Sequence, residues 1–165
     1  MWTLNLSFQV LYVLCIFYGV LSDARYLVIP NWVSAVLVVS FLPYGLLFWP
    51  DFDLLSHLII AVIVLCFSFV LYKLNWIGGG DLKLLTAVSL WMGPAHIASF
   101  IMLTTLLGAL LSLFVIAVRW AANVHRSLSP EKLPIIVRRW LDEGVCPYGI
   151  AIGVAALAMV SSVFT

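Results

Sequence analysis

The chain has 165 residues, of which 65% are hydrophobic and only 9% are charged, with a mean hydropathy of +1.19 and a formal net charge of +1. Soluble domains are about half apolar and about a quarter charged, so this composition excludes a soluble enzyme, a secreted disulfide scaffold and a disordered chain. The small net charge gives no case for nucleic-acid binding, and it leaves partner preference to the placement of individual charges.

Six apolar runs predict six membrane-spanning helices, because a span needs about 20 mainly apolar residues. They cover residues 2–22, 32–49, 56–74, 81–92, 96–118 and 147–164. The first run lacks the basic start and cleavage site of a signal peptide, so we expect it to be retained. Gly93-Pro94 divides the fourth from the fifth, because proline disfavours helix at the preceding residue. We therefore predict an all-α, polytopic membrane protein that forms a single domain over residues 1–165.

The fourth predicted helix is short. Eleven or twelve residues reach only about 18 Å, whereas the hydrocarbon core is about 30 Å thick. We expect its first residue, Asp81, to lie below the membrane surface or in a water-filled depression.

The basic residues fix a predicted orientation, because Lys and Arg stay on the cytoplasmic side. All eight fall in the first, third and fifth connections, which places both termini outside. They are Arg25, Lys73, Lys83, Arg119, Arg126, Lys132, Arg138 and Arg139. The fifth connection, about 119–146, is the one sizeable soluble segment. Its stretch 133–141 mixes apolar and basic residues, which indicates either an amphipathic segment on anionic lipid or a docking surface for a partner.

Metal and cofactor chemistry has no visible ligand set. The three cysteines contain no CxxC pair and the three histidines no HExxH pattern. We therefore expect no metal and no cofactor.

Two of the seven acidic residues stand apart from the others. Five fall in loops and suit solvated charges: Asp51, Asp53, Glu131, Asp142 and Glu143. Asp23 and Asp81 instead lie at helix ends beside apolar sequence, where an ionisable group is costly and usually functional. Singly, Asp23 could be a polar residue just past a helix, tied to Arg25, and Asp81 could be a helix N-cap. Together they form a pair on the same predicted side at similar depth.

Two neighbouring carboxyl groups can hydrolyse a peptide bond without a metal. The ionised one takes a proton from water, while the protonated one donates to the carbonyl oxygen and then to the leaving amine. Such a pair titrates as a unit. A helix N-terminus stabilises negative charge, which favours Asp81 as the base. The three glycines before it suggest either a hinge and approach surface for substrate or a simple connector. In the first case Gly80→Val should reduce activity more than stability, and Gly78→Ala should be mild.

These residues resemble a known family, the prepilin peptidases among the GxGD membrane aspartyl proteases. Residues 78–83 (GGGDLK) contain the GxGD signature with the trailing lysine, residues 23–25 (DAR) and 29–31 (IPN) are similar to the first-aspartate segment, and residues 147–151 (PYGIA) resemble a C-terminal Pro-Tyr-Gly segment. Larger members carry an N-terminal cytoplasmic domain with paired cysteines that is associated with zinc and N-methylation. The chain looks like the short form of tight-adherence (Flp) pilus systems, the TadV/CpaA type, for which methyl transfer is not expected.

The resemblance implies an aspartic-type endopeptidase of the inner membrane that removes the basic leader of prepilins and pseudopilins at the cytoplasmic face. By resemblance Asp23 and Asp81 are catalytic. Supporting roles are implied for Gly78, Gly80, Lys83, Arg25, Pro30, Asn31 and Tyr148.

Three other functions fit part of the pattern. A GxGD protease of other membrane helices usually has Tyr before the first aspartate, where this chain has Ser22. A proton- or ion-coupled carrier would use the same two aspartates, but such carriers often show internal repeats, and none is visible. A non-catalytic assembly scaffold would tolerate the loss of both aspartates.

Overall fold

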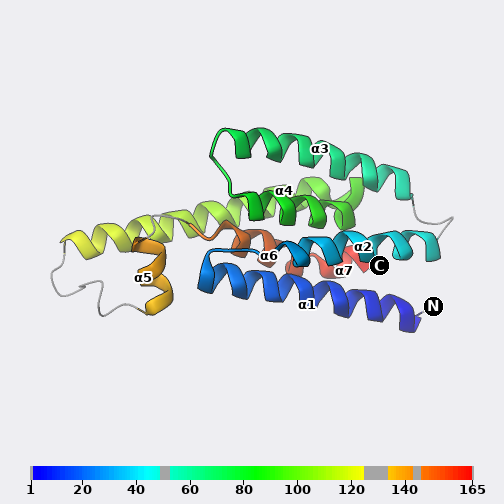
Figure 1. Cartoon of the computed structure of the whole chain (residues 1–165), viewed down its shortest axis with the longest axis horizontal. Coiled ribbons are helices and arrows are strands. Elements are labelled where there is room, and N and C mark those ends of the chain that lie inside the picture. Colours follow the sequence, from blue (N-terminus) through cyan, green and yellow to red (C-terminus); the bar gives the residue numbers. More distant parts are fainter. Residues whose placement is uncertain (1, 49–52, 125–133, 143–145, 165) are drawn as a thin grey trace.

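The computed structural model describes residues 2–48, 53–124, 134–142 and 146–164, and all regular elements within these ranges are helices (Figure 1). The helices are α1 (Trp2–Tyr26), α2 (Asn31–Leu47), α3 (Leu54–Lys73), α4 (Gly79–Val124), α5 (Ile135–Asp142), α6 (Tyr148–Ala158) and α7 (Val160–Phe164). The prediction of an all-helical protein is confirmed.

The element α4 consists of two helices that fold back on each other at Gly93 (Figure 1). Gly93 has φ 58° and ψ −171°, a conformation that residues with a side chain rarely adopt. Packing adds a second reason for glycine, because a Cβ at this position would lie 2.3 Å from ring atoms of His57. The His57 ring is held there by its Nδ1, which lies 2.8 Å from the carbonyl oxygen of Leu90. The predicted break at Gly93-Pro94 is therefore confirmed.

The first half of α4, residues 79–92, is too short to cross a bilayer as a straight helix. At 1.5 Å per residue it spans about 21 Å, compared with a hydrocarbon core of about 30 Å. The second half, from Pro94 to Val124, extends beyond the other helices of the bundle (Figure 1).

Among the described residues, three helical elements are long and apolar enough to cross a membrane: α1, α3 and the Gly79–Ala121 part of α4, the last of which is interrupted at Gly93. The shorter helices α2 and α6 are also apolar. This supports a membrane protein, while the count of six spans and the side on which the termini lie stay predictions. The last predicted helix, 147–164, is divided into α6 and α7 by a turn at Met159. No glycine or proline marks this turn, so the sequence carries no signal for it.

The end of the bundle that contains the N-terminus of α1 and Gly93 is filled by aromatic rings; we call it the closed end. The rings of Tyr12, Tyr44, Trp91 and Phe164 have centroids 5.2–5.7 Å apart in the pairs that touch. The indole Nε1 of Trp91 donates a hydrogen bond of 3.0 Å to the carbonyl oxygen of Leu37. The polar atom of this large buried side chain is therefore satisfied.

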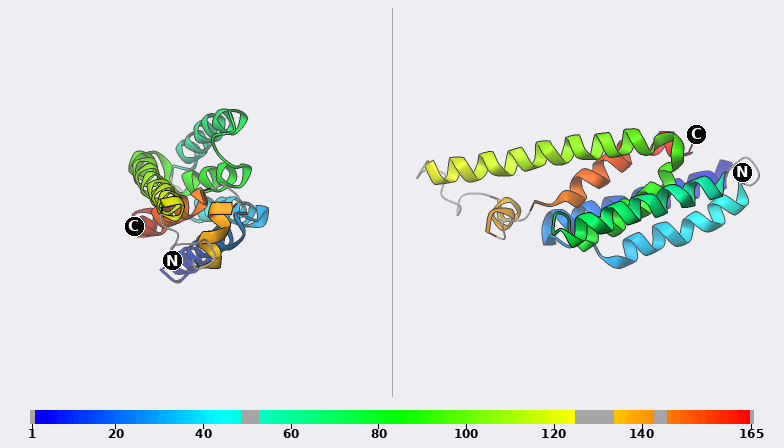
Figure 2. Two further views of the ribbon diagram at one scale, coloured as in Figure 1. Left: turned by 90° about the vertical axis from the view of Figure 1, so that its left-hand side faces the viewer. Right: turned by 90° about the horizontal axis from the view of Figure 1, so that it is seen from above.

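The opposite end, which we call the open end, brings the end of α1 to the start of α6. Helix α1 continues to Tyr26, so Asp23 lies inside its last turns and not just past the helix as predicted. Leu27 then turns the chain with φ 55°, and Ser22 Oγ donates to the carbonyl oxygen of Val28 at 2.7 Å. Helix α6 contacts both α1 and α4 (Figure 2), so its N-terminus lies beside Asp23.

Candidate active site

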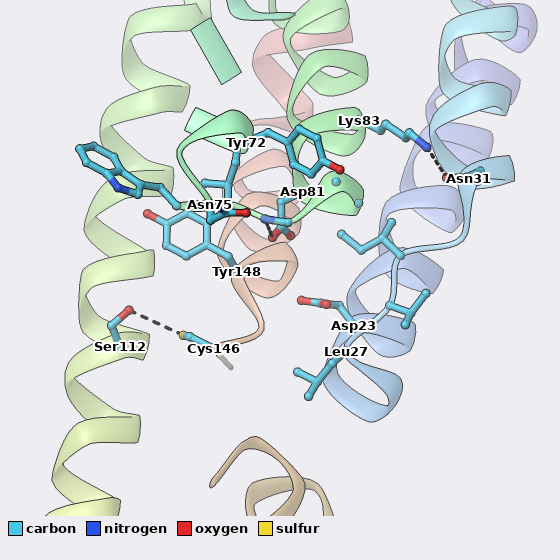
Figure 3. Close-up of a pocket in the computed structure, with 17 residues that line it drawn as sticks. Asp23, Leu27, Asn31, Tyr72, Asn75, Asp81, Lys83, Ser112, Cys146 and Tyr148 are labelled. Atoms are coloured by element: carbon cyan, nitrogen blue, oxygen red, sulfur yellow. Dashed lines mark hydrogen bonds between the residues drawn. The ribbon is translucent and has the colours of Figure 1, made fainter. Parts of the chain in front are cut away.

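A cavity of about 930 Å³ occupies the open end, where the ends of α1, α3, α4 and α6 meet (Figure 3). Its lining is partly polar. The polar side chains include Asp23, Asn31, Asn75, Asp81, Lys83 and Tyr148. Both candidate aspartates therefore line the same cavity, although they are far apart in the chain.

Asp23 is almost fully enclosed, with 5% of its surface exposed. The backbone N–H groups of Gly149 and Ile150, in the first turn of α6, face its carboxylate. A helix N-terminus carries partial positive charge and stabilises an anion at this position. Among the described residues, however, the buried Oδ2 has no hydrogen-bond partner of normal geometry. Asp23 is thus held in place, with one buried oxygen that has no hydrogen-bond partner among the described residues.

Asp81 lies in the first turn of α4 and is half-buried. Its Oδ2 accepts a hydrogen bond of 3.3 Å from the backbone N–H of Gly78, whose carbonyl oxygen accepts the first bond of the helix, from Leu82 N at 3.1 Å. An acidic side chain three residues into a helix that reaches back to the N-cap N–H is half of a capping box. The predicted N-cap role is therefore wrong in position, because Gly78 is the cap and Asp81 supports it.

The two carboxylates face the same space from different helices (Figure 3). They are near enough for the charge of Asp81 to act on Asp23. Both also lie at helix N-termini, Asp81 on α4 and Asp23 against α6. The helix-terminus argument that favoured Asp81 as the base therefore applies to both and does not rank them.

The sequence model of the type IV leader peptidase family matches residues 10–113 of the chain. The chain belongs to the type IV leader peptidase family. Membership makes it a membrane peptidase with a protein substrate, and it confirms the resemblance to the prepilin peptidases. No curated protein and no solved structure gives a significant match.

The family match includes both aspartates and the polar pair that connects their segments. Lys83 Nζ donates a hydrogen bond of 2.8 Å to Asn31 Oδ1, which ties the first half of α4 to the start of α2 (Figure 3). Pro30 precedes α2 and has extended backbone (φ −63°, ψ 137°). The predicted supporting residues Pro30 and Asn31 thus lie where the connection from α1 enters α2, beside the cavity, and Lys83 contacts this point from α4.

Arg25 does not point into this cavity. Its side chain is exposed and is not part of the cavity lining, and the described residues contain no ion pair between it and Asp23. Its carbonyl oxygen instead accepts a hydrogen bond of 3.1 Å from Arg139 Nη1 of α5. The backbone of Arg25 is therefore a contact for α5, and the alternative in which Asp23 is tied to Arg25 finds no ion pair among the described residues, while a supporting role for Arg25 stays a prediction.

Helix α5 forms part of the predicted amphipathic segment and packs on the end of α1. Trp140 is 8% exposed and its Nε1 donates to the carbonyl oxygen of Ala24 at 2.9 Å, next to Asp23. Arg119 Nη2 of α4 donates to the carbonyl oxygen of Leu141 at 3.3 Å. The chain itself thus covers part of the apolar face, while lipid and partner contacts for the rest stay predictions. Residues 125–133 lie outside the described part of the segment.

Glycines at the open end allow backbones and carboxylates to approach closely. A Cβ on Gly149 would lie 2.7 Å from Asp23 Oδ2 and 2.6 Å from Ile29 Cδ1. A Cβ on Gly80 would lie 3.2 Å from Ile29 Cβ, and one on Gly78 would lie 3.1 Å from Asp81 Oδ2. A methyl group on Gly78 would therefore be in tighter than usual contact with the Asp81 carboxylate, so a mild effect of Gly78→Ala requires this side chain to move by a few tenths of an ångström.

The predicted supporting residue Tyr148 lies against Gly108 of α4, where a Cβ would be 2.3 Å from the tyrosine ring. Gly108 could have been noticed as an isolated glycine inside an apolar helix. Asn75 and Ser112 also line the cavity, although no signal in the sequence marked them as functional. Ser112 Oγ lies 3.6 Å from Cys146 Sγ. Within the described ranges, no three His, Cys, Asp or Glu side chains form a group that could hold a metal ion.

Proposed function

We propose that this peptidase removes the leader of Flp-type prepilins by two-aspartate hydrolysis at the cytoplasmic face of the inner membrane. The observation that carries the proposal is the shared cavity of Asp23 and Asp81, into which both carboxylates open. Family membership supplies the peptidase activity, and it leaves no reason to propose a carrier or a scaffold. The similarity of the chain to the short TadV/CpaA form supports an Flp-type substrate.

In the proposed mechanism the half-buried Asp81 is the base, because water reaches it more readily than the enclosed Asp23. Asp81 takes a proton from a water molecule, whose oxygen bonds to the scissile carbonyl carbon while protonated Asp23 donates its proton to the carbonyl oxygen. When the C–N bond breaks, the nitrogen takes the proton held by Asp81, and a hydroxyl of the intermediate returns a proton to Asp23. The pair ends in its starting state, so no cofactor is consumed.

The distribution of charge supports a cytoplasmic site. Six of the eight Lys and Arg residues are described, and they lie in the elements that meet at the open end or extend from it. They are Arg25, Lys73, Lys83, Arg119, Arg138 and Arg139. Basic residues stay on the cytoplasmic side, so the cavity and both aspartates would face the cytoplasm. Reporter fusions after residue 77 should report inside and fusions after residues 53 and 95 outside; an outside report at 77 would reverse the orientation.

The decisive experiment is cleavage of a purified Flp-type prepilin by Asp23→Asn and Asp81→Asn enzymes in detergent. Each variant should lose about 10²–10⁴-fold in turnover, because Asn can neither accept the proton of water nor replace the acid. Asp53→Asn is the matched control and should cleave normally, since Asp53 is an exposed cap of α3 outside the cavity.

The wild-type enzyme should also show a bell-shaped dependence of kcat/KM on pH, because one carboxyl must be ionised and the other protonated. Normal cleavage by folded Asp23→Asn enzyme would rule out the dyad. Activity that is lost in a chelator and restored by zinc would contradict the metal-free mechanism.

A further inference from the structure

A second hollow, of about 400 Å³, lies between α3 and the two halves of α4, and we call it the apolar groove. Its walls are mainly apolar side chains, including Val64 and Phe67 of α3 and Ile101 of α4. It differs in this respect from the active-site cavity, which carries several charged and amide side chains. An apolar groove selects apolar side chains, because polar groups that enter it lose their hydration without gaining partners.

The apolar groove is continuous with the active-site cavity. Four residues line both hollows: Trp76, Ile77, Asp81 and Tyr148. Asp81 therefore stands at the boundary between a polar space and an apolar one. A peptide whose scissile bond lies at Asp81 would extend one way among polar groups and the other way among apolar groups. The geometry thus fits a substrate that changes from polar to apolar at the cleavage point.

One residue that lines the apolar groove carries a buried hydroxyl with no partner among the described residues. Thr104 is 3% exposed, and its Oγ1 has no hydrogen-bond partner within the described part of the chain. Threonine in a helix normally bonds to a carbonyl oxygen three or four residues earlier, as Thr105 and Thr86 do here. The hydroxyl of Thr104 therefore lacks its usual partner, and because its oxygen is buried, the side chain must rotate before it can donate to a group that enters the groove.

We infer that the apolar groove binds the apolar residues that directly follow the scissile bond, with Thr104 Oγ1 donating to a main-chain carbonyl of that segment. This inference rests on the proposed function, because it takes Asp81 as the point of cleavage. It makes Thr104 a positioning residue and the groove a determinant of specificity. The active-site cavity on the other side of Asp81 then holds the polar leader.

The first test fills the groove. Thr105 is exposed and lines it, so Thr105→Trp places a ring in the groove with little burden on folding. Leu106→Trp is the matched control, because Leu106 is the next residue, is 57% exposed and lies outside the groove. Thr105→Trp should raise KM at least tenfold for a prepilin with its natural apolar segment, whereas Leu106→Trp should not. For a prepilin with serines in place of the first apolar residues, all three enzymes should be equally poor.

The second test removes the free hydroxyl. Thr104→Val keeps the shape and should raise KM several-fold with kcat unchanged, and Thr104→Ser should restore the wild-type KM. Thr86→Val is the control, because that hydroxyl already bonds to the carbonyl oxygen of Leu82 at 2.9 Å. Equal KM values for Thr104→Val and wild type would remove Thr104 from the inference.

A binding measurement separates the two proposals and does not depend on turnover. A prepilin with a photoreactive benzophenone side chain at the second residue after the scissile bond is mixed with Asp81→Asn enzyme and irradiated. The cross-link should map to α3 or to residues 101–105 of α4. Cross-linking elsewhere, while wild-type enzyme cleaves the prepilin, overturns the groove and leaves the peptidase proposal standing. Failure of wild-type enzyme to cleave any prepilin overturns both.

Discussion

The two ends of the helix bundle use the same helices in opposite ways. At the closed end, aromatic rings fill the space between α1, α2 and α4, and the Trp91 N–H has a backbone partner. At the open end, a cavity of about 930 Å³ remains, and a buried carboxylate oxygen of Asp23 has no partner among the described residues. The Tyr12 hydroxyl at the closed end also has no hydrogen-bond partner among the described residues, so the ends differ in packing and not in polar satisfaction. Close packing gives rigidity, whereas open polar space gives room for substrate and water. The comparison indicates that stability is concentrated at one end and chemistry at the other.

The largest effect on activity is expected when a methyl group is added at Gly149, beside Asp23 at the open end. The methyl group of Gly149→Ala would meet Asp23 Oδ2 at 2.7 Å and displace either the carboxylate or α6. A displacement of about 1 Å can cost about 10²-fold in rate, so we expect kcat/KM for prepilin cleavage to fall by about that factor. Gly19→Ala is the control, because its Cβ would lie 3.5 Å from Val33 Cγ1 in ordinary contact. Unchanged activity in Gly149→Ala would mean that the position of Asp23 is not critical.

The closed end should respond to truncation with stability and not with activity. Trp91→Ala removes a ring that is 2% exposed and should lower the free energy of unfolding by about 3–5 kcal/mol. Trp120→Ala, at a position that is 67% exposed, should change it by less than about 0.5 kcal/mol. Unfolding in detergent, followed by tryptophan fluorescence and by helix content, measures both. A loss of turnover per folded Trp91→Ala molecule as large as that of Gly149→Ala would erase the division between the ends.

Two adjacent glycines sharpen the comparison within the open end itself. Gly78→Ala should lower kcat/KM about tenfold, or about 1.4 kcal/mol, because its methyl group would lie 3.1 Å from Asp81 Oδ2. Gly79→Ala should keep the activity, since its methyl group would meet only the ring of Tyr72, at 3.5 Å. Gly79 is the first residue of α4, so alanine there should stabilise the helix by less than the roughly 1 kcal/mol of an interior position. Equal activities of the two variants would show that contact with Asp81 is unimportant.

The smallest expected effect lies at the rim of the closed end, where Asp53 caps α3. The Ser56 hydroxyl and backbone N–H donate to its carboxylate and lower its pKa. A pKa that is lower in the folded state gives stability that is complete above the unfolded value of about 3.9 and is lost as pH falls through the folded value. The Tm advantage of wild type over Asp53→Ala should therefore be constant above about pH 5 and shrink below about pH 4. An advantage that grows in acid would contradict the cap.

Most of the fold followed from local patterns in the sequence. Apolar runs predicted most of the helices within a few residues, although α4 continues to Val124, well past its predicted end at about 118. Gly93-Pro94 predicted the break in α4, because proline and a positive φ act on the backbone locally. The end of α1 was predicted too early, since Ser22, Asp23 and Arg25 look like loop residues although the helix continues to Tyr26. Side chains of α5 donate to the carbonyl oxygens of Ala24 and Arg25 in this last turn, a contact that the sequence does not announce. The turn at Met159 had no sequence signal at all.

The sequence by itself determined the composition of a membrane protein, the two aspartates that stand apart and the motifs that place the chain in its family. Those properties depend on residue type and short spacing, which can be read along the chain. Only the tertiary structure decided that α6 points its N-terminus at Asp23, that Asp81 accepts a hydrogen bond from the N-cap Gly78 and that Arg25 lies outside the cavity lining. It also joined an apolar groove to the polar cavity at Asp81. These features depend on which helices lie side by side, and packing between distant segments sets that arrangement.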